Sequence, residues 1–320
     1  MKAAVLHALG EAPRYADFAD PVAGENETIV EVKAASLKNI DRGRARGSHY
    51  DNYAQLPTIV GVDGLAVLPD GTRVYCGMPR APYGIMAERA PIGQRYRFPV
   101  PDGVDDATAA ALPNAGMSGW LALTERAKLQ AGETVLVMGA TGVSGKLAVR
   151  IAKHLGASRV VAAGRNEKVL EELLDHGADA IIPLKQEREK LVHAFHEQKG
   201  EGYDVVLDYL WGQPMEALLY ALTGHDLHAK PHRTRIVQIG EMAGSSISLN
   251  GGVLRSSAIE LMGSGGGSVS PSAMAAMFPK LFALAAQGIL TVDTDVVPLS
   301  DVQAAWDRPV DSGRRVVFVP

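Results

Sequence analysis

Residues 134–166 constrain the fold of this chain more than any other segment. An apolar run at 135–138 leads into a glycine-rich turn at 139–145, and an amphipathic segment follows the turn. A second apolar run at 160–163 ends in the sequence Gly-Arg-Asn at 164–166. This order predicts a strand, a glycine turn, a helix and a second strand. Such a unit binds the pyrophosphate of a dinucleotide at the helix N-terminus, so the sequence predicts a coenzyme site here.

Each glycine of the turn has a separate expected role. Gly139 permits the tight turn, Gly142 lets backbone amides approach the pyrophosphate, and Gly145 allows close packing of helix on strand. The alternative interpretation is an α/β domain whose turn binds nothing. The predicted pyrophosphate site consists of Gly139, Ala140, Thr141, Gly142, Val143, Ser144 and Gly145.

The end of the second strand indicates which dinucleotide is bound. An NAD site usually has Asp or Glu there, which accepts a hydrogen bond from the ribose 2′-hydroxyl. This chain has Gly164, Arg165 and Asn166, with Lys168 beyond them. A guanidinium can pair with a 2′-phosphate through two hydrogen bonds, so we predict NADP. The alternative is a solvated arginine that opens the next helix.

Strands and helices alternate through the middle of the chain. Apolar runs predict strands at 134–138, 159–163, 180–182, 205–207, 235–239 and 258–262. Helical segments are expected at 107–112, 119–127, 144–155, 167–176, 187–198, 213–222 and 272–287. This alternation predicts an α/β fold with a doubly wound parallel sheet of the Rossmann type.

The first hundred residues follow a different pattern. Short apolar runs at 28–34, 65–68 and 73–76 are separated by turn signals such as Pro-Asp-Gly at 69–71. Close spacing of short strands favours an all-β, barrel-like unit. The tail, at 291–297 and 315–319, returns to short strands and is expected to rejoin this unit.

Composition narrows the class of protein. A chain of 320 residues accommodates two domains, and its formal charge of −4 gives no reason to expect nucleic acid or an anionic membrane as a partner. The single cysteine, Cys76, excludes an internal disulfide and a multi-cysteine zinc site. The N-terminus has no apolar signal segment, and Pro279 and Lys280 interrupt the longest apolar stretch. A cytoplasmic location is therefore expected.

Five segments together resemble the zinc-free NADPH:quinone oxidoreductase branch of the medium-chain dehydrogenase/reductase superfamily. They are the glycine turn at 139–145 and the segments at 36–41, 46–50, 57–64 and 112–120. The resemblance covers nearly the whole chain.

The resemblance implies a two-domain protein. A GroES-like β-barrel domain would comprise residues 1–118 and 269–320, and a Rossmann domain residues 119–268. Backbone at the ends of the last two strands would hold the nicotinamide carboxamide, at Gly240, Gly263, Ser264 and Gly265. The last strand would pair with its copy in a second subunit, which implies a homodimer.

The departures from the superfamily pattern concern the metal. Zinc-dependent relatives have Cys, His and Cys near positions 38, 62 and 114, where this chain has Lys38, Val62 and Asn114. A catalytic zinc needs three protein ligands, so we predict that this chain binds no metal. Without a Lewis acid, reduction of a conjugated acceptor is favoured, because the incoming charge spreads onto an oxygen that hydrogen bonds can stabilise.

The predicted function is NADPH-dependent hydride transfer to a quinone or an α,β-unsaturated carbonyl. Candidate catalytic residues are Lys38, Asn39, Tyr50 and Asn114. Lys38 would place a positive charge near a developing oxyanion, whereas the alternative is a solvated surface lysine. Tyr50 would line the acceptor pocket, and the alternative is packing at the barrel edge. Two other functions stay open: a zinc-free alcohol or sugar dehydrogenase, and a non-catalytic NADPH-binding sensor.

Overall fold

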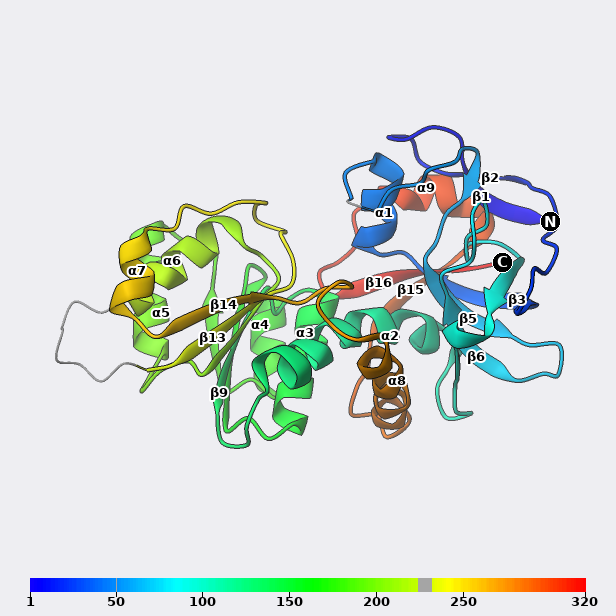
Figure 1. The fold of residues 1–320 in the computed structure, drawn as a ribbon. Helices are drawn as coiled ribbons and strands as arrows, with labels where there is room; N and C mark the ends of the chain where they lie inside the picture. Colours follow the sequence, from blue (N-terminus) through cyan, green and yellow to red (C-terminus); the bar gives the residue numbers. More distant parts are fainter. Residues whose placement is uncertain (50, 224–231) are drawn as a thin grey trace. The chain divides into compact units, whose positions relative to one another are not determined.

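The computed structural model describes residues 1–49, 51–223 and 232–320 (Figure 1). Two compact units are present, and each is described by itself. The first unit comprises residues 1–114 and 278–320, and the second unit comprises residues 115–277. The domain boundaries expected from the sequence, at 118/119 and 268/269, stay predictions.

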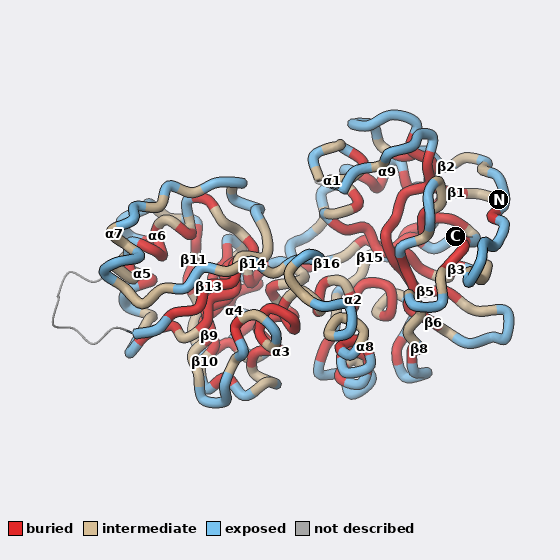
Figure 2. Tube along the Cα trace, in the orientation of Figure 1, coloured by how far each residue is buried: buried red, intermediate tan, exposed pale blue. Residues whose placement is uncertain are grey.

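A six-stranded parallel sheet forms the centre of the second unit. The strand order β11-β10-β9-β12-β13-β14 confirms the predicted Rossmann sheet. The strands are β9 (Thr134–Met138), β10 (Arg159–Gly164), β11 (Ala180–Pro183), β12 (Val205–Asp208), β13 (Thr234–Gln238) and β14 (Ile259–Gly263). Figure 2 shows that the inner strands are mostly buried, as expected for a sheet covered on both faces.

Helices connect the strands of this sheet. They are α3 (Val143–His154), α4 (Glu167–Leu174), α5 (Arg188–Gln198), α6 (Gly212–Leu222) and α7 (Gly251–Ser256). The amphipathic α3 buries Leu147 and Ile151 and begins directly at the glycine turn, as the sequence predicted. Within the described residues, no helix is both long and apolar enough to span a bilayer.

One helix differs from the prediction. The two helical segments expected at 107–112 and 119–127 form a single α2 (Asp106–Leu121), which continues into a π-helical turn at Ala122–Ala127. Pro113 lies inside α2, where it removes one backbone hydrogen bond. Its neighbours Leu112 and Ala115 are buried, so the packing of the helix compensates for the missing bond. The predicted helix at 272–287 is α8 (Pro271–Ala286).

The first unit consists mainly of β-structure. A seven-stranded mixed sheet has the order β15-β16-β3-β5-β6-β8, with β7 paired to β3, and a three-stranded sheet has the order β2-β1-β4. The strands are β1 (Lys2–Leu6), β2 (Arg14–Asp17), β3 (Glu27–Ser36), β4 (Thr58–Ile59), β5 (Asp63–Val67), β6 (Arg73–Gly77), β7 (Arg89–Gly93), β8 (Arg97–Pro99), β15 (Asp293–Pro298) and β16 (Arg314–Val319).

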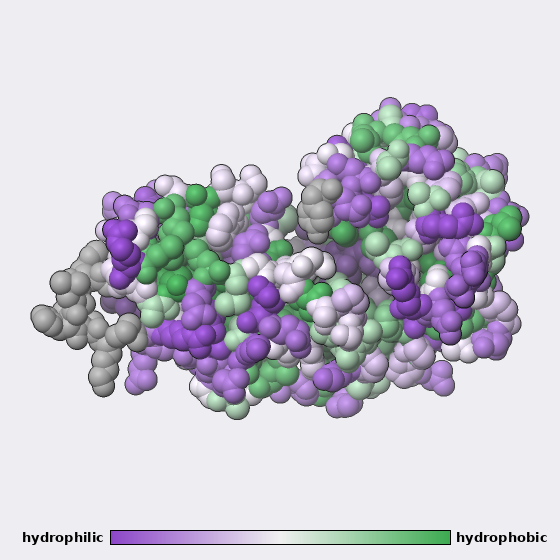
Figure 3. Space-filling model, viewed as in Figure 1, coloured by the Kyte–Doolittle hydropathy of each residue, from purple (hydrophilic) through white to green (hydrophobic). Residues whose placement is uncertain are grey.

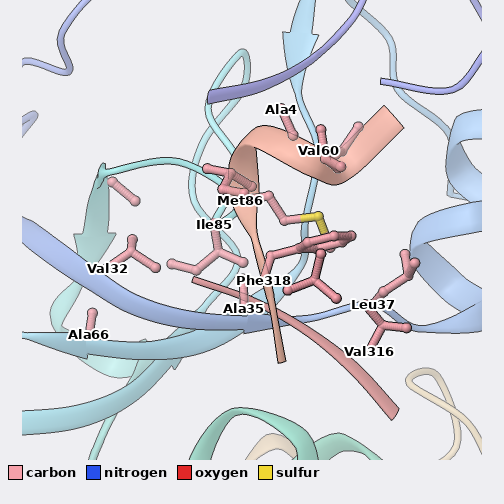
Figure 4. Close-up of a cluster of buried hydrophobic side chains, with 14 of the residues drawn as sticks. Ala4, Val32, Ala35, Leu37, Val60, Ala66, Ile85, Met86, Val316 and Phe318 are labelled. Carbon is pink, nitrogen blue, oxygen red and sulfur yellow. The ribbon is translucent and has the colours of Figure 1, made fainter. Parts of the chain in front are cut away.

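The tail of the chain completes this unit. β16 pairs antiparallel with β3, which confirms that the C-terminal strands rejoin the N-terminal ones. Phe318 of β16 lies in the buried cluster with Ile85 and Met86 (Figure 4). Two short helices, α1 (Asn39–Arg46) and α9 (Val302–Trp306), were not predicted from the sequence.

Candidate coenzyme site

The carboxyl ends of five parallel strands in the second unit are in register. Met138 of β9 pairs with Ala163 on one side and Asp208 on the other, Asp208 pairs with Gln238, and Gln238 pairs with Gly263. The segments that leave these strands therefore line one edge of the sheet, where such folds bind ligands. This edge brings together the glycine turn, residues 164–166, Gly240 and residues 263–265.

The glycine turn is fixed to the neighbouring strand. The backbone N–H groups of Gly139 and Ala140 both donate to the carbonyl of Ala163, each at 2.9 Å. Gly139 has a φ of +89°, which favours glycine. Gly142 is the N-cap of α3 and leads directly into the helix.

Close packing explains one glycine of the turn and not another. A Cβ on Gly145 would lie 2.2 Å from the carbonyl oxygen of Gly139, so only glycine fits there. A Cβ on Gly142 would meet its nearest atom, the carbonyl oxygen of Gly139, at 3.6 Å, an ordinary van der Waals contact, so packing does not require glycine there. The first-turn amides of Val143 and Ser144 have no carbonyl four residues earlier in the helix. They make an anion-binding site of the kind that a pyrophosphate requires, and the turn therefore fits a dinucleotide.

The end of β10, at residues 164–166, has no carboxylate; Glu167 is the first acid after it, in the first turn of α4. Gly164 is buried, and its carbonyl accepts a hydrogen bond from Leu184 at 2.8 Å. Arg165 and Lys168 are exposed, and among the residues that the structure describes Arg165 has no ion pair. The side chain of Asn166 caps α4 by accepting from the N–H of Val169 at 3.3 Å. The strand end thus fits a 2′-phosphate better than a bare ribose.

Asp208 stabilises the turn that leaves β12, a role that sequence reasoning missed. Its carboxylate accepts hydrogen bonds from the backbone N–H groups of Leu210 at 2.9 Å and Trp211 at 3.1 Å. Trp211 has a φ of +56°, an uncommon value for a residue with a side chain. Burial raises the pKa of Asp208 to about 6. The signal in the sequence was an acid placed directly after a buried apolar strand.

Tyr209 packs the end of β12 against the glycine turn. A Cβ on Gly139 would lie 3.1 Å from the Cβ of Tyr209, and a Cβ on Gly240 would lie 2.9 Å from the carbonyl oxygen of Tyr209. The Tyr209 hydroxyl lies 3.2 Å from the Ser118 hydroxyl. The Tyr209 carbonyl leaves no room for a side chain at position 240. The N–H of Gly240 donates to the carbonyl of Asp208 at 3.1 Å, which holds this backbone at the carboxyl edge.

The segment after β14 is also held at this edge. Arg126 donates from Nε to the carbonyl of Gly263 at 2.8 Å. The N–H of Ser264 donates to the carbonyl of Gln238 at 2.8 Å, and the N–H of Gly265 donates to Ser268 Oγ at 2.8 Å. The backbone predicted to hold the carboxamide is thus ordered by specific contacts.

In the first unit, Lys38 is buried in an ionic cluster. Only 2% of Lys38 is exposed, so the alternative of a solvated surface lysine is wrong. Its ammonium donates to the carbonyl of Ser36 at 2.7 Å and lies 3.2 Å from Asp63 Oδ1 and 3.5 Å from Asp41 Oδ2. Burial raises the pKa of Asp63, while the nearby ammonium of Lys38 opposes the rise. Sequence reasoning missed Asp63, which its place at the start of a buried strand could have indicated.

The other candidate catalytic residues are placed separately. Asn39 is the exposed first residue of α1, and Asn114 is half-buried on α2. Tyr50 lies outside the described residues. Asp41 accepts hydrogen bonds from the N–H groups of Lys38 at 2.8 Å and Val62 at 3.0 Å, and so ties the start of α1 to the start of β5.

The donor set does not fit a catalytic zinc. Positions 38, 62 and 114 offer an ammonium, an alkyl group and an amide, whereas zinc prefers thiolate, imidazole and carboxylate. Cys76 is buried in the core of the first unit. Across residues 1–49, 51–223 and 232–320, no group of three or more His, Cys, Asp or Glu residues could hold a metal ion.

Comparisons with known proteins agree with this architecture. The family model described as zinc-binding dehydrogenase matches residues 144–286. The chain is 31% identical over 205 residues to the chloroplastic NADPH-dependent alkenal/one oxidoreductase of Arabidopsis thaliana, a match that covers 59% of this chain and 51% of the relative. It is 26% identical over 350 residues to the probable NADPH-dependent quinone reductase tdiC of Emericella nidulans, with 96% of each chain covered.

A solved structure extends the similarity to the whole chain. The quinone oxidoreductase of Thermus thermophilus, whose complex with NADPH is also known, superposes with a TM-score of 0.77 at 27% identity and covers 100% of both chains. The parallel sheet and its glycine turn define a dinucleotide-binding protein of Rossmann type with an additional GroES-like β-domain. These similarities support the quinone oxidoreductase-like branch of the medium-chain dehydrogenase/reductase superfamily.

Proposed function

We propose that this protein is an NADPH-dependent oxidoreductase that transfers hydride to a quinone or an α,β-unsaturated carbonyl without zinc. The observation that carries the proposal is the carboxyl edge of the six-stranded sheet. There the glycine turn and the end of β10 offer backbone amides and the Arg165 guanidinium, with no carboxylate at position 164. Relatives named for NADPH-dependent reduction of quinones and alkenals support the same assignment.

Residues of the second unit would hold the coenzyme. The turn at 139–145 and the start of α3 bind the pyrophosphate, and Arg165 with Lys168 binds the 2′-phosphate. Asn166 keeps α4 in place through its cap, and the backbone at 240 and 263–265 orients the nicotinamide carboxamide. When bound, NADPH supplies the hydride.

The acceptor class follows from the donor set at positions 38, 62 and 114. These residues do not fit a Lewis-acid metal, so negative charge developing on the acceptor is stabilised by hydrogen bonds alone. A conjugated acceptor suits this arrangement, because its charge moves to an oxygen remote from the carbon that receives the hydride. Asn39, Tyr50 and Asn114 are the proposed donors to that oxygen.

Lys38 takes a different part in the proposal. Its ammonium is engaged with Ser36, Asp41 and Asp63 inside the first unit. A buried, paired ammonium holds the start of α1 against β5 and thereby positions Asn39, the residue that follows it. We therefore assign Lys38 a positioning role rather than direct contact with the acceptor.

We also propose a cytoplasmic homodimer. β14 pairs only with β13 in the described sheet, so its outer edge offers unpaired backbone groups, and Leu261 on it is exposed. Long exposed edges are normally covered, and pairing with β14 of a second copy would cover this one. Hydrophilic residues are visible on both units in Figure 3, as in a protein surrounded by water.

The proposal is tested by NADPH oxidation with a panel of small quinones and enones, followed by absorbance at 340 nm. The Gly145→Ala variant should lose turnover, because its Cβ would lie 2.2 Å from a backbone oxygen, whereas Gly93→Ala should not, because the nearest atom would be 3.7 Å away. Tight NADPH binding with no turnover on any acceptor would favour the sensor. Reduction of NADP⁺ by alcohols or sugars alone would favour the dehydrogenase.

A further inference from the structure

We propose that Thr141 determines coenzyme specificity by occupying the space that a side chain at position 164 would need. An acidic side chain at this strand end selects NAD, because it accepts from the ribose 2′-hydroxyl. Thr141 excludes any such side chain and so keeps the site suited to NADP. This inference rests on the proposed function and concerns one residue of the same site.

The side chain of Thr141 crowds the end of β10 at Gly164. A Cβ on Gly164 would lie 2.4 Å from Cγ2, 3.0 Å from Oγ1 and 3.2 Å from Cβ of Thr141. Real Cβ atoms essentially never approach another heavy atom closer than 3.0 Å. All three of the nearest atoms belong to the side chain of Thr141, so this single residue forbids a side chain at position 164.

Backbone conformation does not require the glycine. Gly164 does not have a positive φ, and it lies in a regular strand where it pairs with Pro183 of β11. Glycine in a strand is unfavourable because it loses more conformational entropy than other residues. The contact with Thr141 is therefore the feature that explains glycine at this position.

Thr141 cannot easily move away. It is buried, and its branched Cβ restricts the rotation of the side chain. The backbone next to it is fixed, because the N–H of Ala140 donates to the carbonyl of Ala163. Rotation about χ1 moves the methyl and hydroxyl groups to other staggered positions, of which two lie near position 164, so at least one group stays there. Thr141→Ala would remove the two closest atoms and leave the Cβ of residue 141 at 3.2 Å.

The test is a double-mutant cycle on coenzyme binding. Titration calorimetry with NADP⁺, NAD⁺, 2′,5′-ADP and 5′-AMP measures the dissociation constants of four proteins: the wild type, Gly164→Asp, Thr141→Ala and the double variant. We expect Gly164→Asp alone to weaken binding of both coenzymes, because the carboxylate displaces the glycine turn. The double variant should bind NAD⁺ and shift the NADP⁺/NAD⁺ affinity ratio at least tenfold toward NAD⁺. Thr141→Ala alone should still prefer NADP⁺.

A second cycle measures stability without any coenzyme. Gly164→Ala should lower the thermal midpoint, and Thr141→Ala in the same chain should restore much of the loss, while Gly93→Ala serves as the matched control. The inference is overturned if Gly164→Asp alone accepts NAD⁺ as well as the double variant, or if Thr141→Ala gives no rescue. Failure of the wild type to bind either coenzyme would contradict the proposed function but leave the stability cycle as an independent test.

Discussion

Replacement of Lys38 by Met removes the cation of the buried ionic cluster and keeps most of its apolar stem. The side chains of Lys38, Asp41 and Asp63 are 2%, 0% and 7% exposed. Loss of one member of a buried ion pair costs about 3–5 kcal/mol, because the partner charge stays buried without compensation. In this variant two carboxylates remain, and Asp63 Oδ1 loses the ammonium that lies 3.2 Å from it in the wild type. We expect the first unit to lose about 3–5 kcal/mol of unfolding free energy.

Tryptophan fluorescence in urea can report on the first unit alone. Trp306 lies in the core of this unit, while Trp120 and Trp211 belong to the second unit. In a background in which the latter two are Phe, the unfolding of the first unit follows from Trp306. Separate measurement is necessary because a two-unit protein does not have one unfolding transition by default.

Two variants complete the experiment. Lys33→Met removes a half-buried lysine from β3 and should cost less than about 1 kcal/mol, as is usual for surface pairs. Asp63→Asn added to Lys38→Met should recover at least ~1 kcal/mol, because it removes one of the uncompensated charges. If Lys38→Met and Lys33→Met lowered the unfolding free energy of the first unit equally, the stabilising role of the buried ion pair would be refuted. A fall in kcat at unchanged stability would instead favour direct catalysis by Lys38.

Three further predictions concern the second unit. Burial raises the pKa of Asp208 from 3.8 to about 6, so the folded state binds this proton more tightly than the unfolded state does. The free energy of unfolding should therefore fall as the pH rises through this window. Urea titrations at pH 4 and pH 7 should show a smaller fall for Asp208→Asn than for the wild type. Arg165→Met should raise the KM for NADPH by roughly 10–100-fold and leave that for NADH nearly unchanged, since it removes one charge-assisted contact, with Arg14→Met of the first unit as the control. Leu261→Arg should convert the proposed dimer to a monomer in light scattering, and an unchanged mass would argue against pairing through β14.

Sequence periodicity was sufficient to predict the Rossmann unit. Buried parallel strands are continuous apolar runs, and the glycine turn at 139–145 fixed where the first of them ends. The six-stranded parallel sheet and the return of the C-terminal strands to the first unit were both confirmed. The predicted break between two helices near Pro113 was wrong, because local helix signals do not include the packing that stabilises α2 across the proline.

Contacts between residues far apart in the chain could not be predicted from the sequence. The local sequence around Lys38 does not show that it is buried, because its partner Asp63 belongs to β5, a separate segment of the chain. The contact between Gly164 and Thr141 joins two segments that the sequence shows only as separate parts of one motif. Asp208 is likewise recognisable as functional only once its carboxylate is seen to bind the backbone of the following turn.

The most direct test of the central claim is isotope transfer from the coenzyme to an enone. The protein is incubated with a small α,β-unsaturated ketone and NADPH that carries one deuterium at C4, and the 4R and 4S stereoisomers are used separately. We predict that one stereoisomer gives a product with deuterium at the β-carbon, while the α-carbon takes its proton from water. Tight binding of NADPH without deuterium in any enone product and without oxidation by quinones would contradict the proposed hydride transfer.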